Sequence, residues 1–522
     1  MRVATRTCSL LGMGLLLLGT IGCMDLAVEN FTEPDRERAL ADTGDLEELV
    51  AGAFNSWWTS QSQSAGMGNS LSGLAMQHSQ WAGNFAFGFL HQIPRPVLPN
   101  DPTATEYSNL AHNWEWNYRA LSSIAIGLQA IAEGAPLPPA EELRLNAFAK
   151  FVQGLSHGTV ALLYDQAFIM DETVEDATTL QLQPSAEVME AAFGFFDEAI
   201  ALASQSNFTI PSLWMSRQTT SDELVGIIHA YKARFRIGMA RDPSEREAID
   251  WNAVLSDLDQ AMDGDFVMQI GGAFGHQVLF NGARCRWSQQ QNWLRGMADQ
   301  SGAYQEWAST YPITDRTPFV WVTPDQRFPQ GSTLDEQREN PGMYIIVPGT
   351  RGMTCSLGDH FNGPAGGTWR WSNYRDDRHD GWLGAGSTGP AVEISQRELQ
   401  LYRAEAYLRQ GAEEAAAAII DETRTTHGGL SSALENSECV PRMPDGSCGD
   451  IWEALKWEVR LETYQMGYGK AFWDARGWGD LIEGTLLEVP VPSRELTFQN
   501  LPSYTFGGGE PSSAPVGTYG FP

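Results

Sequence analysis

The sequence has few basic residues for its length. Its 522 residues include 34 lysines and arginines against 65 aspartates and glutamates, a formal net charge of −31. Proteins that bind nucleic acid or dock on anionic lipid carry basic surfaces, so this composition argues against both partners. Attachment to a membrane would need a lipid or a spanning helix, and no apolar run after residue 22 is long enough to cross a bilayer.

Motifs of several enzyme classes are also missing. There is no phosphate loop, no His-Glu-x-x-His zinc motif and no Gly-x-Ser-x-Gly elbow, since Ala385–Gly389 lacks the first glycine. The acidic run Asp376–Asp380 lacks calcium-loop spacing and contains an arginine, so we interpret it as a solvated turn. Among so many acids, a glycosidase-type carboxylate pair cannot be recognised from sequence. We therefore expect no enzymatic activity, no cofactor and no bound metal.

Cysteine is scarce, with six residues in the chain. Two of them lie within the first 23 residues, which leaves Cys285, Cys355, Cys439 and Cys448. No Cys-x-x-Cys spacing occurs among these, which disfavours a metal site. An even number in an exported chain suggests two disulfides, and three pairings are possible. We favour Cys439–Cys448, which closes a short loop containing proline and glycine, and hence Cys285–Cys355. Four buried thiols are the alternative.

The N-terminus has the layout of a bacterial export signal. Two arginines precede the apolar run Leu10–Ile21, which is too short to span a bilayer and is followed by a glycine and Cys23. We expect 1–22 to be a lipoprotein signal peptide, although Thr20 stands where leucine is usual. Cys23 would then be the lipidated first residue, and the polar segment 23–44 a tether. A plain secretory signal with an incidental cysteine is the alternative.

Most of the remaining chain shows the spacing of apolar residues that is typical of helices. Thr220 and Glu223 form a capping box at the start of one of them. The expected helices occur in pairs separated by glycine or proline, as in helical hairpins, so we predict an all-α chain. They run from Asp45 through Trp57, and then over 107–132, 140–169, 185–204, 220–239, 399–409 and 412–426.

The segment 271–390 differs in character, because it is rich in glycine and has no long periodic stretch. Irregular segments of this length are functional or disordered, and the tryptophan content argues against disorder. A tryptophan ring can lie against the apolar face of a sugar or bury a peptide side chain, although a single tryptophan more often packs in the core. We expect two or three to be exposed in a pocket. The tryptophans are Trp287, Trp293, Trp307, Trp321, Trp369, Trp371 and Trp382.

The stretch from Ile451 to Met466, read as a helix, has two apolar faces with charges in the seams between them. A surface helix normally has one apolar face, so two faces indicate neighbours on both sides, as in a stack of helical hairpins. An aromatic and glycine-rich segment, Phe472–Gly479, follows, and then Val489–Pro492 with Glu495. One face holds Trp452, Leu455, Val459 and Met466, and the other Ala454, Trp457, Leu461 and Tyr464.

In this order, these parts resemble the C-terminal signature of the SusD/RagB family of outer-membrane nutrient-binding lipoproteins. Val459 and Met466 replace an arginine and a glutamate of the family pattern, and extra residues precede Trp473. The residues that fit are Glu458, Arg460, Leu461, Glu462, Gly467, Trp473, Asp474, Arg476, Trp478, Gly479, Pro490, Pro492 and Glu495.

The resemblance implies one domain over 45–522 with a tetratricopeptide-like helical fold. It would comprise helical repeats (45–270), a loop-rich ligand-binding insertion (271–390), and a C-terminal hairpin with the signature (391–522). It further implies a surface lipoprotein of the bacterial outer membrane. Such a protein binds an oligosaccharide, or less often a peptide, and delivers it to a SusC-like TonB-dependent transporter without covalent chemistry.

Family members bind ligand through one loop soon after the first helix and through others from the middle region. The resemblance therefore implies which regions of the chain bind ligand, but it does not identify the binding residues by a motif. Trp473 and Trp478 are expected in the hydrophobic core. Two other functions remain open: a secreted glycan-degrading enzyme with a helical fold, and a helical-repeat scaffold for protein partners. The expected ligand-binding residues are Trp81 and Asn84 in the first loop, and Trp287, Tyr304, Trp307 and Trp321 in the middle region.

Overall fold

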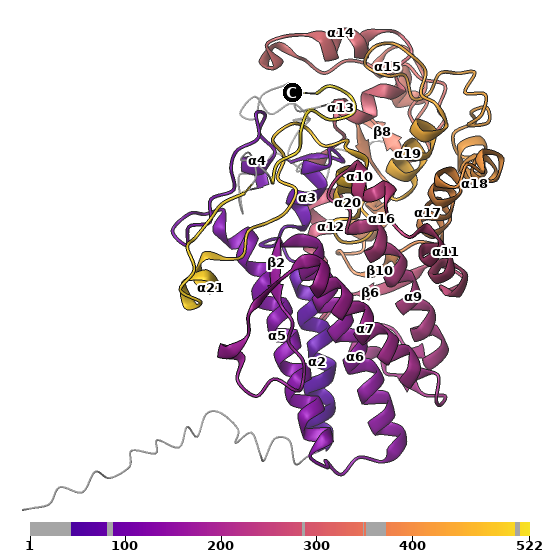
Figure 1. Ribbon diagram of the computed structural model, residues 1–522. Coiled ribbons are helices and arrows are strands. Elements are labelled where there is room, and N and C mark those ends of the chain that lie inside the picture. The colour runs from indigo at the N-terminus through magenta and orange to yellow at the C-terminus, as the bar shows by residue number, and fades with distance from the viewer. Residues whose placement is uncertain are drawn as a thin grey trace, which may run out of the picture.

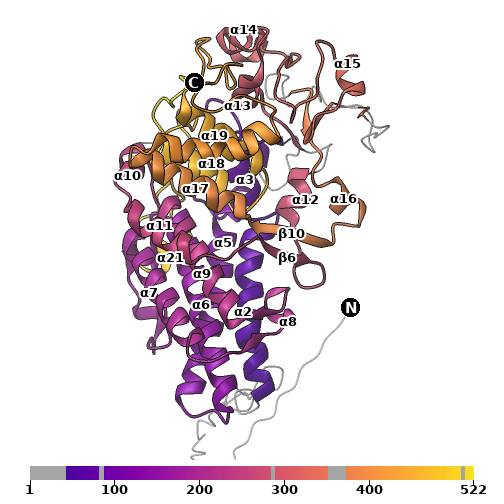
Figure 2. The ribbon, with the colours of Figure 1, turned by 90° about the vertical axis from the view of Figure 1, so that its right-hand side faces the viewer.

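The computed structural model describes residues 43–80, 87–283, 288–347, 349–350, 372–506 and 512–521. The long helices within 43–203 lie side by side at one end of the molecule, and the short helices within 292–339 lie at the other (Figures 1 and 2). This architecture confirms the predicted all-α class with a loop-rich middle region. No helix in the described ranges combines the length and the apolar character needed to cross a membrane.

The helices are α2 (Thr43–Ser62), α3 (Gly68–Leu74), α4 (Phe87–Leu90), α5 (Tyr107–Ala132), α6 (Pro139–Leu163), α7 (Ser185–Ala203), α8 (Ser212–Met215), α9 (Ser221–Gly238), α10 (Pro243–Glu247), α11 (Trp251–Gln260), α12 (Gln277–Ala283), α13 (Asn292–Arg295), α14 (Ala303–Ser309), α15 (Leu334–Glu339), α16 (Asp380–Gly384), α17 (Gln396–Arg409), α18 (Glu413–Thr426), α19 (Ile451–Glu462), α20 (Lys470–Trp478) and α21 (Ser493–Phe498). The strands are β1 (Ser79–Gln80), β2 (Gln166–Phe168), β3 (Leu182–Pro184), β4 (Thr209–Ile210), β5 (Thr219–Thr220), β6 (Phe266–Ile270), β7 (Ser288–Gln289), β8 (Ile345–Ile346), β9 (Arg375–Asp376) and β10 (Gly389–Ile394).

The predicted helices are present, and most end within a few residues of their expected bounds. The capping box of α9 is confirmed, since Thr220 Oγ1 accepts from the Glu223 amide at 3.2 Å and the Glu223 carboxylate accepts from the Thr220 amide at 2.8 Å. The exception is α6, which ends at Leu163 and not at Ile169. Tyr164 adopts an extended conformation and leads into β2, which pairs with β3.

Helix α6 packs closely against its neighbours because two of its residues are glycines. A Cβ atom on Gly154 would lie 2.4 Å from the Phe196 ring on α7, and one on Gly158 would lie 2.1 Å from the Phe235 ring on α9. Both distances are far below van der Waals contact. The two phenylalanine rings therefore occupy the space that the missing side chains leave, and any larger residue would push the helices apart.

In the described ranges, each strand pairs with one other strand, and every pair is antiparallel. The longest pair joins β6 to β10, with Gly389 opposite Ile270. It thus closes the base of the segment that the sequence marks as irregular, 271–390. In the described part of that segment, the helices α12 to α16 have at most seven residues each. The loop-rich region therefore begins and ends at two strands that pair with each other.

Helix α19 separates two hydrophobic clusters, as its two apolar faces predict. Trp457 and Leu461 belong to a cluster formed with the middle region. Leu455 and Val459 belong to a second cluster, formed with α17 and α18. Ala454 was predicted with Trp457 but packs in the second cluster, because a side chain of that size reaches only its nearest neighbour. The helix also ends at Glu462, earlier than the predicted Met466.

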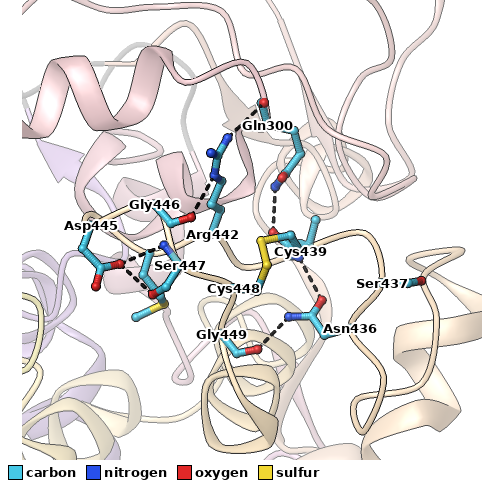
Figure 3. Close-up of a disulfide and its surroundings, with 12 residues drawn as sticks. Gln300, Asn436, Ser437, Cys439, Arg442, Asp445, Gly446, Ser447, Cys448 and Gly449 are labelled. Atoms are coloured by element: carbon cyan, nitrogen blue, oxygen red, sulfur yellow. Dashed lines mark hydrogen bonds between the residues drawn. A yellow bond between two sulfur atoms is a disulfide. The ribbon is translucent and has the colours of Figure 1, made fainter.

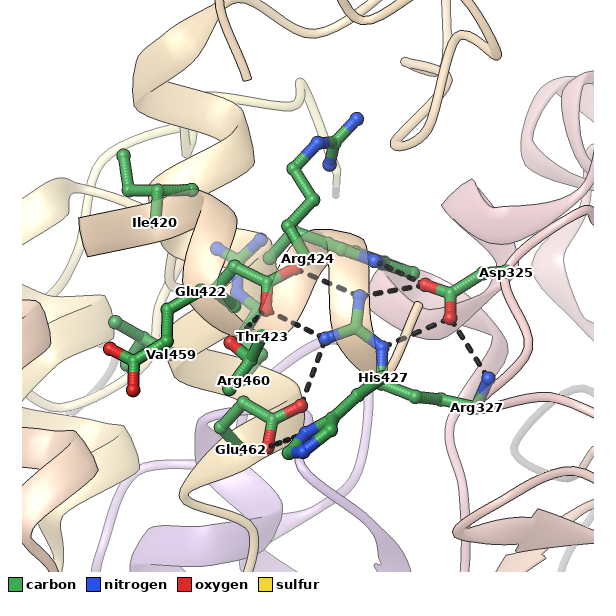
Figure 4. A network of polar contacts seen from close by, with 12 residues as sticks. Asp325, Arg327, Ile420, Glu422, Thr423, Arg424, His427, Val459, Arg460 and Glu462 are labelled. Carbon is green, nitrogen blue, oxygen red and sulfur yellow. Dashed lines mark hydrogen bonds and ion pairs between the residues drawn. The ribbon is translucent and has the colours of Figure 1, made fainter. Parts of the chain in front are cut away.

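The charged seams of α19 are buried as well. Arg327, in the middle region, is fully enclosed and donates to Asp325, Glu458 and Glu462 at 2.8 to 3.0 Å. Figure 4 shows Arg327 between Asp325 and Glu462, with Thr423 of α18 beside them. Burial lowers the pKa of Arg327, but the carboxylates of Asp325 and Glu458 outweigh this and hold it well above its usual value. We call Asp325, Arg327, Glu458 and Glu462 the Arg327 cluster.

The predicted disulfide Cys439–Cys448 is confirmed. It lies in the loop between α18 and α19, and Gln300 Nε2 of the middle region donates to the Cys439 carbonyl at 2.8 Å (Figure 3). Asn436 Nδ2 donates to the Gly449 carbonyl at 2.7 Å within the same loop. The bridge therefore fixes a loop that contacts the middle region. Cys285 and Cys355 lie outside the described residues.

The acidic turn Asp376–Asp380 is not the solvated turn that we expected. Asp376 is 7% exposed, and its carboxylate pairs with Arg378 at 2.7 Å. Asp380 pairs with Arg375 at 2.6 Å. Arginines of the same segment therefore neutralise these carboxylates. Among the described residues, no group of three acids, histidines or cysteines could hold a metal ion.

Replacing Arg327 with methionine should strongly destabilise the fold. The variant would leave buried carboxylates without their cation, which typically costs about 3–5 kcal/mol. Chemical denaturation should show this as a lower free energy of unfolding. The matched control is Arg403→Met, because the Arg403–Asp259 pair has side chains that are 27% and 65% exposed and such pairs contribute about 0–1 kcal/mol. Equal losses in the two variants would contradict the role of the Arg327 cluster.

Candidate functional site

Of the six expected ligand-binding residues, the three that the structure describes lie in the hydrophobic core. Tyr304, Trp307 and Trp321 are 0%, 4% and 0% exposed. Trp321 stacks on Tyr374 with 3.9 Å between ring centroids and donates from Nε1 to Asn292 at 3.0 Å. We therefore assign these three side chains to the core in place of the ligand surface expected from the sequence. Trp81, Asn84 and Trp287 lie outside the described residues.

The regions that were expected to bind ligand meet at a strand pair. Strands β1 and β7 are antiparallel, with Ser79 opposite Gln289 and Gln80 opposite Ser288. Trp81 follows Gln80 directly in the sequence, and Trp287 directly precedes Ser288. The loop after the first helices and a loop of the middle region are thus joined by backbone hydrogen bonds beside the two expected tryptophans.

Buried amide side chains form a polar layer beside this strand pair. Gln291 Nε2 donates to the His78 carbonyl at 3.1 Å. Gln465, in the loop between α19 and α20, donates from Nε2 to His78 Nδ1 at 2.8 Å. Burial lowers the pKa of His78 to about 3, so the neutral ring can accept this bond. The layer connects the strand pair to the C-terminal signature.

The backbone of the α19–α20 loop holds Gln465 in place. Gln465 has a φ of 58°, in the left-handed region that residues with side chains rarely adopt. Gly467 has a φ of 66° in the same loop, and a Cβ there would lie 2.8 Å from Arg234 Nη2. The signature glycine is therefore required both by its conformation and by its close approach to Arg234.

A small cavity lies beside Gln465. Its volume is about 20 Å³, which is room for a water molecule but not for a sugar ring. Gln61 Nε2 and Ser62 Oγ line it and have no hydrogen-bond partner among the described residues. The cavity is suited to ordered water behind the polar layer. Its walls are formed by Trp58, Gln61, Ser62, Ser72, His276, Val278, Glu393, Gln465, Gly467 and Tyr468.

A larger hollow, of about 460 Å³, lies between the start of α9 and the loop from α11 to β6. This volume is typical of small-molecule sites. Its wall includes Asp222, Glu223, Asp263 and Asp265 but no aromatic ring, and Arg217 pairs with Glu223 at 2.7 Å. The hollow offers acceptors for sugar hydroxyls but no ring for the apolar face of a sugar.

Glu393, in the wall of the small cavity, and Glu398 are both held by one arginine. Arg234 binds Glu393 at 2.8 Å and Glu398 at 2.7 Å, and all three side chains are at most 4% exposed. Burial raises the pKa of Glu393 to about 6, although Arg234 opposes the shift. A glycosidase needs carboxylates that face its substrate, whereas these two are occupied by one arginine.

Residue spacing in the sequence does not single out His78, Gln291 or Gln465. A signal was present in four consecutive amides, Gln289 to Asn292, between two tryptophans. Such a run on a helical surface would be unremarkable. Its placement beside β1 is a tertiary property that residue spacing does not encode.

Comparisons with known proteins give a structural likeness only. No protein-family model and no curated protein matches the sequence. A SusD-like protein from Bacteroides fragilis NCTC 9343 superposes with a TM-score of 0.50 at 15% identity, over 85% of this chain and 87% of that one. A SusD superfamily protein from Parabacteroides distasonis ATCC 8503 gives a TM-score of 0.50 at 10% identity, over 83% and 88%.

The chain has the SusD-like fold. Its helical hairpins are therefore tetratricopeptide-like, as expected. The fold also gives the signature residues structural roles. Trp473 and Trp478 are 2% and 6% exposed, as predicted for core residues. Arg476 donates to the Gly238 and Leu487 carbonyls at 2.7 and 2.6 Å. The SusD-like signature thus fixes α20 against α9 and the C-terminal segment.

The neutral, buried His78 should make the fold sensitive to acid. Its pKa is about 3 in the folded protein against 6.5 as the ordinary value, so protons bind the unfolded chain preferentially as the pH falls below 6.5. Linkage then predicts a loss of about 2 kcal/mol of stability between pH 8 and pH 5 from this residue. In His78→Gln, the fall in stability between these two pH values should be smaller by that amount. An unchanged fall would contradict the assignment.

Proposed function

We propose that this chain is a lipid-anchored protein of the bacterial outer membrane that binds a nutrient and delivers it to a SusC-like TonB-dependent transporter. An oligosaccharide is the favoured ligand. The proposal is supported by the SusD-like fold together with the C-terminal signature. It is also supported by the sequence of residues 1–22, which has the layout of a bacterial export signal and is followed by Cys23. The segment 23–44 would act as a tether, and its last two residues already belong to α2, which begins at Thr43.

The observation that carries the ligand proposal is the β1–β7 pair. It joins the loop after the first helices to the middle region, which are the two regions expected to bind ligand, and it adjoins Trp81 and Trp287 in the sequence. Tryptophan rings beside a layer of amides are suited to sugars, because rings contact the apolar face and amides bind hydroxyls. Asn84 in the first loop would add a further amide.

The proposed mechanism is capture and release without covalent chemistry. The carboxylates next to the polar layer are paired with Arg234, which gives the enzyme alternative no support. Ligand would be held at the β1–β7 end, and the protein would close over the transporter pore as a lid. The alternative functions remain outcomes of the test below.

Calorimetric titration of residues 24–522 against panels of oligosaccharides and peptides should give saturable binding to a class of oligosaccharide. Product analysis of each mixture should recover the ligand intact, because Arg234 holds the described carboxylates Glu393 and Glu398. Cleavage that persists through rigorous purification would contradict the proposal and favour a glycan-degrading enzyme. Failure to bind any ligand would contradict oligosaccharide capture by the isolated chain and favour a scaffold for protein partners.

Trp81→Ala and Trp287→Ala should each weaken oligosaccharide binding by roughly 30-fold, or about 2 kcal/mol, which is typical of a tryptophan at the centre of an interface. The melting temperature should not change. The control is Trp116→Ala, since this partly buried ring on α5 lies under Arg119 at 4.4 Å and belongs to another part of the fold. If the control lost as much affinity as the other two variants, the proposed location would be wrong.

A further inference from the structure

Arg295 on α13 has a buried guanidinium that pairs with no carboxylate among the described residues. The residue is 2% exposed. Its Nε donates to Gln290 Oε1 at 2.9 Å, and its Nη2 donates to the Arg460 carbonyl. Nη1 has no hydrogen-bond partner among the described residues. Arg234 and Arg327 are buried to a similar degree, but each binds at least two carboxylates. Arg295 is therefore a buried cation that no acid of its own neutralises.

A second arginine with a free donor lines the same cavity. Arg460 on α19 has a side chain that is 10% exposed, and its Nη2 pairs with Asp480 at 2.5 Å. Its Nη1, like that of Arg295, has no hydrogen-bond partner among the described residues. The two arginines line a buried cavity of about 20 Å³. The other wall residues are Ala75, Met76, Gln77, Leu294, Val459, Thr463, Ala471, Asp474, Ala475 and Trp478.

The acidic side chains in and near the cavity wall form ion pairs with lysines and other arginines. Asp474 pairs with Lys470 at 2.6 Å and with Arg246 at 3.2 Å. Asp480 pairs with Lys456 at 3.0 Å as well as with Arg460. The described carboxylates in and near the cavity wall are thus paired with other cations, and none of them pairs with Arg295. An isolated buried charge is costly unless a counter-charge accompanies it.

We propose that this cavity binds one small anion of the halide class, which accepts hydrogen bonds from Nη1 of Arg295 and Nη1 of Arg460. The volume admits a species close to the size of a water molecule, which excludes sugars and larger carboxylates. A water molecule could accept the same hydrogen bonds, but it would leave the charge uncompensated. An anion satisfies both requirements.

The electrostatics of Arg295 agree with this site. Burial is the main reason why the pKa of Arg295 is lowered to about 9; Tyr464 and Asp376 oppose the shift, whereas Arg378 and Arg460 add to it. The side chain nevertheless remains protonated at neutral pH, so its charge persists inside the protein. A bound anion would connect α13 of the middle region to α19 and α20, and would stabilise the junction behind the β1–β7 pair.

The test compares the melting temperature of residues 24–522 in sodium chloride and in sodium gluconate at equal ionic strength. Gluconate is too large for the cavity. Chloride or bromide should raise the melting temperature by about 1–2 °C in a saturable way. Crystals grown in sodium bromide should show an anomalous peak between Arg295 and Arg460. Equal melting temperatures in all salts, or bromide crystals without this peak, would overturn the proposal.

Arg295→Met should abolish the difference between chloride and gluconate. The matched control is Arg442→Met, because Arg442 donates to the carbonyls of Gly446 and Gln300 and lies outside the cavity wall. The control should keep the difference. If both variants kept it, the effect would come from another site and the proposal would fail. Should Arg295→Met not fold, the bromide peak in the unaltered protein decides the question.

Discussion

The ion pairs of Arg327 are the interaction on which the rest of the structure depends. This one guanidinium joins the middle region to a charged seam of the buried helix α19, through Glu458 and Glu462. Thr423 of α18 donates to Glu458 at 2.7 Å, and Trp457 donates to Asp325 at 3.0 Å. Burying these carboxylates is favourable only when all their partners are present. The cluster therefore fixes α18, α19 and the middle region in one arrangement.

The position of α19 also determines how the proposed ligand-binding end is arranged. Once α19 is fixed, the loop that follows it places Gln465 against His78, and α13 brings Arg295 to the Arg460 carbonyl. The β1–β7 pair lies next to these contacts, because His78 directly precedes β1. Loops that bind ligand must be positioned by rigid elements. Here the rigid element is the segment that carries the C-terminal signature, whose Trp473 and Trp478 are buried.

Much of the helical fold follows from the sequence because helix periodicity and capping are local properties. The bounds of α5, the capping box of α9 and the two apolar faces of α19 depend on residues within a few positions of one another. The Cys439–Cys448 bridge was predictable for the same reason, since its loop is short.

The candidate site was less predictable because burial and pairing of distant residues are not local. Glu458 and Glu462 look like solvent-facing residues in the seams of α19, yet their partner Arg327 lies more than a hundred residues away in sequence. Trp307 and Trp321 fit a ligand surface by composition and region, but they pack in the hydrophobic cluster that the middle region shares with Trp457 and Leu461 of α19.

The most direct test of where ligand binds is hydrogen–deuterium exchange of residues 24–522, with and without the oligosaccharide that titration selects. Exchange should become slower in 77–80 and 288–292, at the β1–β7 pair, and should change little at the larger acidic hollow. Slower exchange in 222–227 and 260–265, with none at the strand pair, would show that the ligand occupies the hollow between α9 and β6 and would contradict binding at the strand pair.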